Sequence, residues 1–183
     1  MKIIPLTLPG LYLIETKLHS DSRGFFAERY RKDLLDARGI HISFVQDNHS
    51  HSKPGVLRGL HYQVNPTQGK MVSAIRGAIF DVAVDIRVSS PTFGRWYGVE
   101  LTGTNGKSLW IPAGYAHGYC VLGDEPADVF YKVDGPYSAA TEGGIRWNDS
   151  DVGIQWPIQN PQVSERDIVL PSLSEYSKNP AFK

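Results

Sequence analysis

The chain has 183 residues, of which 41% are hydrophobic and 21% charged, which excludes an intrinsically disordered protein and predicts a single domain over residues 1–183. Nineteen basic and 19 acidic side chains give a formal net charge of zero, so we expect neither nucleic acid nor a membrane as partner. The single cysteine, Cys120, excludes an intramolecular disulfide, and with an N-terminus that lacks a signal-peptide core it predicts a cytoplasmic protein.

Short aromatic and β-branched runs between glycine- and proline-containing turns indicate an all-β protein. In chain order, strands are predicted at residues 11–18, 25–30, 56–63, 70–76, 79–88, 95–102, 108–111, 118–122 and 129–133. The clearest is 79–88, where apolar side chains such as Val82 and Val84 alternate with Asp81, Ala83 and Asp85. This alternation predicts a strand with two chemically different faces.

Helical patterning is confined to short segments. Residues 33–38, followed by Gly39 as a C-cap, predict one short helix, and residues 161–167 predict a single turn. Residues 172–183 are polar enough to predict a C-terminal extension on the surface of the domain. We find no repeat and no internal linker, so the pattern is that of one β domain.

Two glycine-punctuated segments end in a histidine: Gly55 precedes His61, and Pro112-x-Gly114 precedes His117. This spacing resembles the two motifs of the cupin superfamily, which implies a cupin-type jelly-roll β-barrel or sandwich with a site in the barrel mouth. Metal-binding cupins carry His-x-His and a following glutamate, but here Gln63 follows His61 and Lys70 lies in the glutamate region. A lysine opposes a divalent cation by charge, so the sequence predicts no metal at this site.

A second histidine pair, His49 and His51, lies on one face of any strand that contains it. A metal site could be built from these rings, but no carboxylate follows at ligand spacing, which favours a position near a loop or the rim. Cys120 lies in an aromatic and aliphatic run and is predicted to be a small buried hydrophobe.

A site without a metal can still catalyse proton transfer with its own side chains. His61 can act as a proton acceptor, Lys70 can stabilise an oxyanion, and Tyr131 is expected to point inward from its strand. Four aspartates are candidates for the carboxylate that orients the histidine: Asp47, Asp81, Asp85 and Asp167. Spacing does not choose among them, and taken singly each of these side chains more often has a purely structural role.

Longer segments, taken together, resemble the dTDP-4-dehydrorhamnose 3,5-epimerases, cupin-fold enzymes of deoxysugar nucleotide biosynthesis. The likeness runs from about residue 3 to residue 170. It is carried by residues 21–28, 46–50, 55–63, 81–87, 110–118, 131–132, 142, 147–149, 156–157 and 164–167.

The resemblance implies that His61 is the proton-abstracting base, Asp167 its orienting partner, and Tyr131 the acid on the opposite face of the substrate. Lys70 would stabilise the enolate, and no metal or other cofactor would take part. The implied substrate contacts are Arg23, Glu28, Gln46, Asp47, Asn48, Arg58, Lys70, His117, Tyr137 (against the thymine ring), Glu142 and Arg166. The implied partners are a dTDP-linked 4-keto-6-deoxyhexose and a second copy of the chain in a homodimer.

Some positions depart from the family pattern. Arg166 stands where lysine is expected, and Ala113, Tyr115 and Ser150 replace an expected proline, phenylalanine and proline. An arginine keeps the charge but changes the geometry, so these differences concern substrate detail rather than the class of reaction.

Other functions are compatible with parts of the pattern. A relative acting at only C3 or C5, or a sugar ketoisomerase, would need the same histidine and tyrosine. A sugar-binding module without chemistry is disfavoured by the joint presence of His61, Lys70 and Tyr131, and a metal-dependent oxygenase by Gln63 and Lys70.

Overall fold

Strands dominate the computed structural model, which describes residues 1–183. The strands are β1 (Lys2–Pro5), β2 (Tyr12–Glu15), β3 (His19–Asp21), β4 (Gly24–Phe26), β5 (Gln46–Ser52), β6 (Leu57–Gln63), β7 (Lys70–Arg76), β8 (Ala78–Asp85), β9 (Trp96–Thr102), β10 (Lys107–Ile111), β11 (Tyr115–Leu122), β12 (Ala127–Val133) and β13 (Glu142–Gly144). Three short helices are α1 (Lys32–Asp36), α2 (Glu165–Ile168) and α3 (Leu173–Lys178). No helix is long and apolar enough to cross a membrane.

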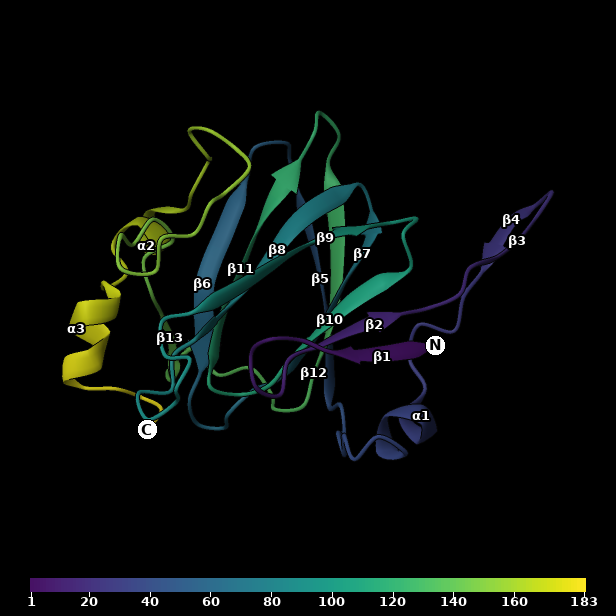
Figure 1. Cartoon of the computed structure of the whole chain (residues 1–183). Coiled ribbons are helices and arrows are strands. Elements are labelled where there is room, and N and C mark those ends of the chain that lie inside the picture. Colours follow the sequence, from purple (N-terminus) through teal and green to yellow (C-terminus); the bar gives the residue numbers. More distant parts are fainter.

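Two antiparallel sheets make up the body of the molecule (Figure 1). A six-stranded sheet has the order β1-β2-β10-β7-β12-β5, and a five-stranded sheet has the order β13-β6-β11-β8-β9. The largest core cluster joins the two sheets, because Val72 and Val129 of the first pack in it with Ile79 and Val121 of the second. The prediction of an all-β sandwich with a few short helices is therefore confirmed.

Strand β8 shows the predicted alternation, but both of its faces are buried. Val82 and Val84 pack against the C-terminal segment, in a cluster that includes Leu173 and Tyr176 of α3. Tyr176 also donates a hydrogen bond from its hydroxyl to the backbone oxygen of Ile86 at 2.9 Å. The segment predicted as a surface extension thus covers the outer face of the five-stranded sheet.

Several boundaries differ from the predicted ones. Strand β5 was not predicted, because its sequence is polar on both faces. Of the predicted strand 25–30 only residues up to Phe26 are extended in a ladder, and the helix predicted at 33–38 spans Lys32–Asp36. These segments carry few buried side chains, so hydrophobic periodicity gives little guidance to their limits.

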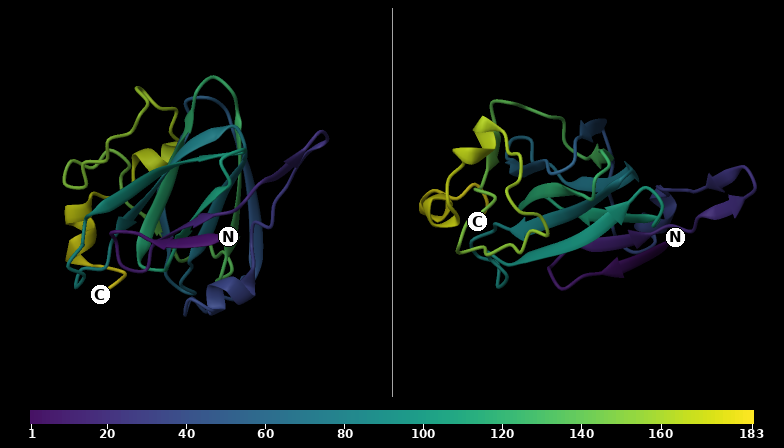
Figure 2. Two further views of the ribbon diagram at one scale, coloured as in Figure 1. Left: turned by 45° about the vertical axis from the view of Figure 1, so that its right-hand side comes forward. Right: turned by 90° about the horizontal axis from the view of Figure 1, so that it is seen from above.

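The hairpin of β3 and β4 stands away from the body of the molecule, as both views of Figure 2 show. It pairs with neither main sheet, and all six of its residues are exposed. Phe25 and Phe26 are 49% and 67% exposed. An isolated two-stranded hairpin is at best marginally stable in water, and this arm gains no stabilising packing from the two main sheets.

Candidate active site

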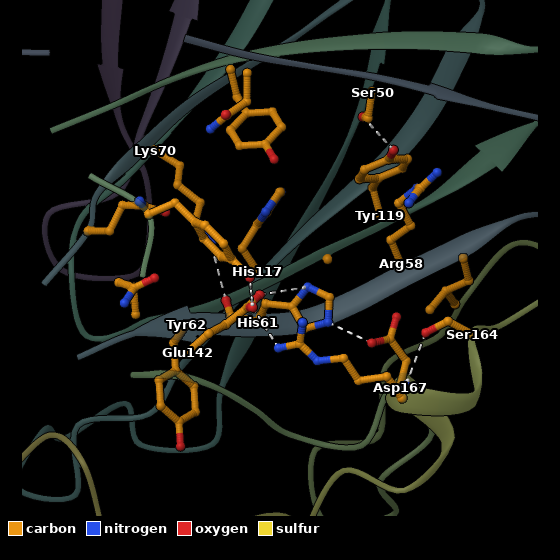
Figure 3. Close-up of a pocket in the computed structure, with 18 of the residues that line it drawn as sticks. Ser50, Arg58, His61, Tyr62, Lys70, His117, Tyr119, Glu142, Ser164 and Asp167 are labelled. Atoms are coloured by element: carbon orange, nitrogen blue, oxygen red, sulfur yellow. Dashed lines mark hydrogen bonds and ion pairs between the residues drawn. The ribbon is translucent and has the colours of Figure 1, made fainter. Parts of the chain in front are cut away.

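A cavity of about 640 Å³ opens between the two sheets, beside α2 (Figure 3). Strands β5, β7 and β12 of the six-stranded sheet contribute to its wall, and β6 and β11 contribute from the five-stranded sheet. Most of the residues predicted from sequence line it: Gln46, Asn48, Arg58, His61, Lys70, His117, Tyr131, Tyr137, Glu142, Arg166 and Asp167. Positions far apart in the chain therefore meet at one site.

The imidazole of His61 contacts Asp167, a residue of the short helix α2 that lines the cavity (Figure 3). His61 Nε2 donates to Asp167 Oδ1 at 2.7 Å, and the backbone N–H of Gly59 donates to Asp167 Oδ2 at 3.2 Å. Burial opposes ionisation of this carboxyl, but these hydrogen bonds together hold the pKa of Asp167 below its usual value. With Nε2 donating, Nδ1 is the ring nitrogen left to accept a proton.

The other candidate aspartates have different partners. Asp81 accepts from Nε2 of His117 at 2.7 Å, and Asp85 accepts from Arg87, Ser90 and Thr92. Asp47 binds Lys132 at 2.7 Å on the outer face of β5. Among the four, only Asp167 contacts His61 in the structure.

Strands β6 and β11 approach each other closely where they carry the two histidines. A Cβ on Gly59 would lie 2.5 Å from Cα of Gly118, and Gly59 has a φ of +120°, which other residues rarely adopt. His61 and His117 are directly opposite in the ladder. Glycine at position 59 thus allows both rings to share one wall of the cavity.

Lys70 and Tyr131 come from the opposite sheet. Lys70 is buried, its Nζ donates to the backbone oxygen of His61 at 3.3 Å, and burial lowers the pKa of Lys70 to about 8, although Glu142 and Asp81 favour its charged form. Burial also raises the pKa of Tyr131, so its phenol is protonated at neutral pH. A proton donor and a cation therefore face the histidine across the cavity.

Glu142 lies between His61 and the part of the cavity that is lined by Tyr137 and Arg166. Its Oε2 accepts from Arg166 at 2.6 Å and from the hydroxyl of Tyr137 at 2.9 Å, while Oε1 lies 3.9 Å from His61 Nδ1. The backbone N–H of Tyr137 donates to Gln46 Oε1 at 3.1 Å. This end thus presents an aromatic ring beside an amide, a combination suited to a nucleobase.

Three predicted contacts lie outside the cavity of their own chain. Asp47 points to the opposite face of β5 from Gln46 and Asn48, because side chains alternate along a strand. Arg23 lies on the projecting hairpin, where its side chain is 88% exposed and pairs with Asp21. Glu28 follows the hairpin and pairs with Arg31.

His49 and His51 lie in β5, at the edge of the six-stranded sheet, rather than in a loop. Both rings are on one exposed face, and both contact Asp128 Oδ1, at 3.1 Å and 2.9 Å. No group of three or more histidine, cysteine, aspartate or glutamate side chains is arranged to hold a metal ion. The two histidines are therefore surface residues that contact Asp128 of the neighbouring strand β12.

Sequence reasoning did not select several polar residues that line the cavity: Ser50, Tyr62, Gln63, Gln68, Tyr119, Gln162 and Ser164. Ser164 caps α2 by accepting from the backbone N–H of Asp167 at 3.1 Å. Ser50 continues the alternation of Gln46 and Asn48 along β5, so recognising that strand would have found it.

The fold and the site define a class of protein: a jelly-roll β-sandwich with an acid–base pocket, in which a carboxylate-oriented histidine faces a buried lysine and a phenol. Comparison with known proteins narrows this class. The family model for dTDP-4-dehydrorhamnose 3,5-epimerase matches residues 5–175. The dTDP-4-dehydrorhamnose 3,5-epimerase of Shigella flexneri is 51% identical over 170 residues, which cover 92% of this chain and 93% of the relative.

Solved and curated relatives extend the comparison. The crystal structure of dTDP-6-deoxy-D-glucose-3,5-epimerase from Legionella pneumophila, in complex with dTDP-4-keto-L-rhamnose, has a TM-score of 0.90 and 46% identity, covering 94% of this chain and 93% of that one. A dTDP-4-dehydrorhamnose 3-epimerase from Streptomyces niveus is 39% identical over 91% of this chain and 81% of its own length. The chain belongs to the dTDP-4-dehydrorhamnose 3,5-epimerase family of cupin-type isomerases, which confirms the resemblance found in the sequence.

Proposed function

We propose that this chain inverts C3 and C5 of dTDP-4-keto-6-deoxyglucose, in the biosynthesis of dTDP-L-rhamnose. The observation that carries the proposal is the placement of a base and an acid on opposite sheets. His61, held by Asp167 at 2.7 Å, belongs to the five-stranded sheet, and Tyr131 belongs to the six-stranded sheet, with both lining one cavity. Inversion at a carbon requires removal of a proton from one face and delivery of another proton to the opposite face.

The substrate's own ketone makes this chemistry accessible. A carbonyl at C4 acidifies the hydrogens on C3 and C5, so Nδ1 of His61 can remove either one. The electron pair of the broken C–H bond moves into an enolate, whose negative oxygen is stabilised by the Lys70 ammonium. Tyr131 then donates its proton to the opposite face of the same carbon, and the carbonyl re-forms. His61 releases the proton it took to solvent, and Tyr131 regains one from solvent, before the next inversion. The sequence of steps needs no oxidant or reductant.

The rest of the cavity supplies groups for the nucleotide. Gln46, Asn48 and Tyr137 would hold the thymidine, and Arg58 and Arg166 provide positive charge for the diphosphate. The two sheets share this one pocket, which supports treating residues 1–183 as one domain. A single buried cysteine suits a reducing compartment, and we propose that the protein works in the cytoplasm.

Proton NMR of dTDP-4-keto-6-deoxyglucose incubated with the protein in D₂O tests the proposal. We expect solvent deuterium at both C3 and C5 and the inverted configuration at both carbons. Deuterium and inversion at one carbon alone would identify a single-site epimerase, the activity for which the Streptomyces niveus relative is named. A protein that binds the sugar nucleotide without any exchange would be a binding module, and the proposal would then fail.

The low pKa of Lys70 predicts an alkaline limit on the rate. Its charged form stabilises the enolate, and this form is lost as the pH rises through about 8, so turnover should fall above that pH. Tyr131 keeps its proton there because burial raises its pKa. We expect Lys70→Met to be slower by about 10²–10³-fold and to lack this alkaline limb in a pH–rate profile. A wild-type rate that stays constant from pH 7 to 9.5 would contradict the role of Lys70.

Turnover is expected to be independent of added metal. The prediction rests on Gln63 and Lys70, which stand where a metal-binding cupin needs further ligands; Gln63 instead donates to Thr141 Oγ1 at 2.6 Å. Exhaustive treatment with a chelator should leave the rate of epimerisation unchanged. Loss of activity that Fe, Mn or Zn alone restores would refute this.

A homodimer would complete the site. Phe25 and Phe26 are exposed on the projecting hairpin, and Arg23 and Glu28 lie outside their own cavity. We propose that the arm packs on a second copy and brings these two charged side chains to its pocket. Sedimentation should give twice the 20.3 kDa of the chain, and Phe26→Asp should favour the monomer and weaken turnover. A wild-type monomer at micromolar concentration would contradict the proposal.

A further inference from the structure

Four polar side chains form a continuous hydrogen-bonded row in the wall of the cavity, three of which Figure 3 labels. Arg58 Nε donates to Ser52 Oγ at 2.9 Å. The hydroxyl of Tyr119 lies 3.0 Å from Ser52 Oγ and 2.9 Å from Ser50 Oγ. The row therefore runs from a charged guanidinium, through a buried phenol, to a serine that lines the cavity.

The direction of each hydrogen bond follows from counting protons. Arg58 Nε can only donate, so Ser52 Oγ accepts from it. Ser52 is 2% exposed and has one other partner, Tyr119, so its own proton goes to the Tyr119 oxygen. Tyr119 has a single hydroxyl proton, which goes to Ser50 Oγ. Ser50 is then an acceptor in the row, and its own proton has no partner in the protein.

We propose that Ser50 is a binding residue that donates its hydroxyl proton to the diphosphate of the nucleotide sugar, and that Tyr119 is the positioning residue that turns it toward the ligand. The inference rests on the proposed function and adds two residues to it. A fixed O–H donor beside a guanidinium is the combination that recognises an anionic phosphoryl oxygen. No carboxylate takes part in the row, so nothing within it competes for the charge of Arg58.

The position of Ser50 along β5 agrees with this assignment. It follows Gln46 and Asn48 on the same face of the strand, at successive alternate positions. The amide end of that face, where Gln46 contacts Tyr137, is assigned to the thymidine. The far end, where the row connects Ser50 to Arg58 through Tyr119 and Ser52, would then meet the next group of the nucleotide, which is the diphosphate.

Binding of dTDP and of thymidine to Ser50→Ala separates a phosphate contact from a general effect on the pocket. We expect the Kd for dTDP, measured by calorimetry, to rise about 10- to 100-fold, because a hydrogen bond to a charged group is lost. The Kd for thymidine, measured by NMR titration, should stay unchanged. Ser50→Thr, which keeps the hydroxyl, should bind dTDP within about threefold of wild type, and thermal unfolding checks that each variant is folded.

Tyr119→Phe tests the positioning role, since it keeps the ring and removes the proton that fixes Ser50. Its Kd for dTDP should rise about 3- to 10-fold, and the double variant should bind no more weakly than Ser50→Ala alone. Equal weakening of dTDP and thymidine by Ser50→Ala, or no weakening of dTDP, would overturn the inference. Failure of the wild-type protein to bind dTDP at all would instead overturn the proposed function.

Discussion

Replacing His61 by asparagine is expected to abolish deuterium uptake at both C3 and C5 of the keto sugar. Asparagine preserves the polarity and approximate size of the side chain but cannot accept a proton at neutral pH, so no enolate forms at either carbon. The exchange rate, followed by proton NMR in D₂O, should fall by at least about 10⁴-fold. The loss should be equal at the two carbons, because the proposed mechanism assigns both proton removals to Nδ1 of His61, whose Nε2 is held by Asp167 at 2.7 Å.

Two further variants test whether the loss of exchange is specific to His61. Asp167→Asn keeps an oxygen that can accept from Nε2 but removes the negative charge that stabilises the protonated imidazole, so it should slow exchange without abolishing it. His49→Asn changes an exposed histidine on the outer face of β5 and should exchange at the wild-type rate. Exchange by His61→Asn at the wild-type rate would show that another group is the base.

The fold was predictable from sequence where side chains are divided between two faces. The alternation of residues 79–88 locates β8, and the run at 70–76 coincides with β7. The alternation could not show that both faces of β8 are buried, because the covering residues, Leu173 and Tyr176, lie almost a hundred positions later. Strand β5 escaped prediction for a related reason: its inner face carries polar side chains toward the cavity and its outer face meets solvent, so neither is apolar.

For the site, the sequence showed which types of residue are present but not which of them are in contact. The types of residue needed for acid–base chemistry were evident, but the choice of Asp167 among four aspartates depends on a contact between residues 106 positions apart. The resemblance to the family selected Asp167, and the geometry of the fold agrees. No sequence pattern marked Tyr119 as a site residue. Its proposed role depends on a row of hydrogen bonds between residues of three strands, β5, β6 and β11.

Tyr131→Phe should have a different effect from any change at His61. The variant still has the base, the orienting carboxylate and the cation, so it should still form the enolate. Solvent deuterium should therefore continue to enter, returned by His61 to the face from which the proton left. Inversion should fall by about 10²–10⁴-fold, the usual contribution of a general acid, because no donor remains on the opposite wall.

The ratio of exchange to inversion is the decisive measurement. In the wild-type protein both processes draw on one enolate, whose fate depends on which wall returns the proton first. Tyr97→Phe, at a partly buried tyrosine outside the cavity, should leave the ratio unchanged, whereas Tyr131→Phe should raise it by about the factor that inversion loses. If exchange and inversion fall together in Tyr131→Phe, the phenol takes part in forming the enolate. If neither falls, protonation comes from another group, and the placement of acid and base on opposite sheets does not explain the inversion.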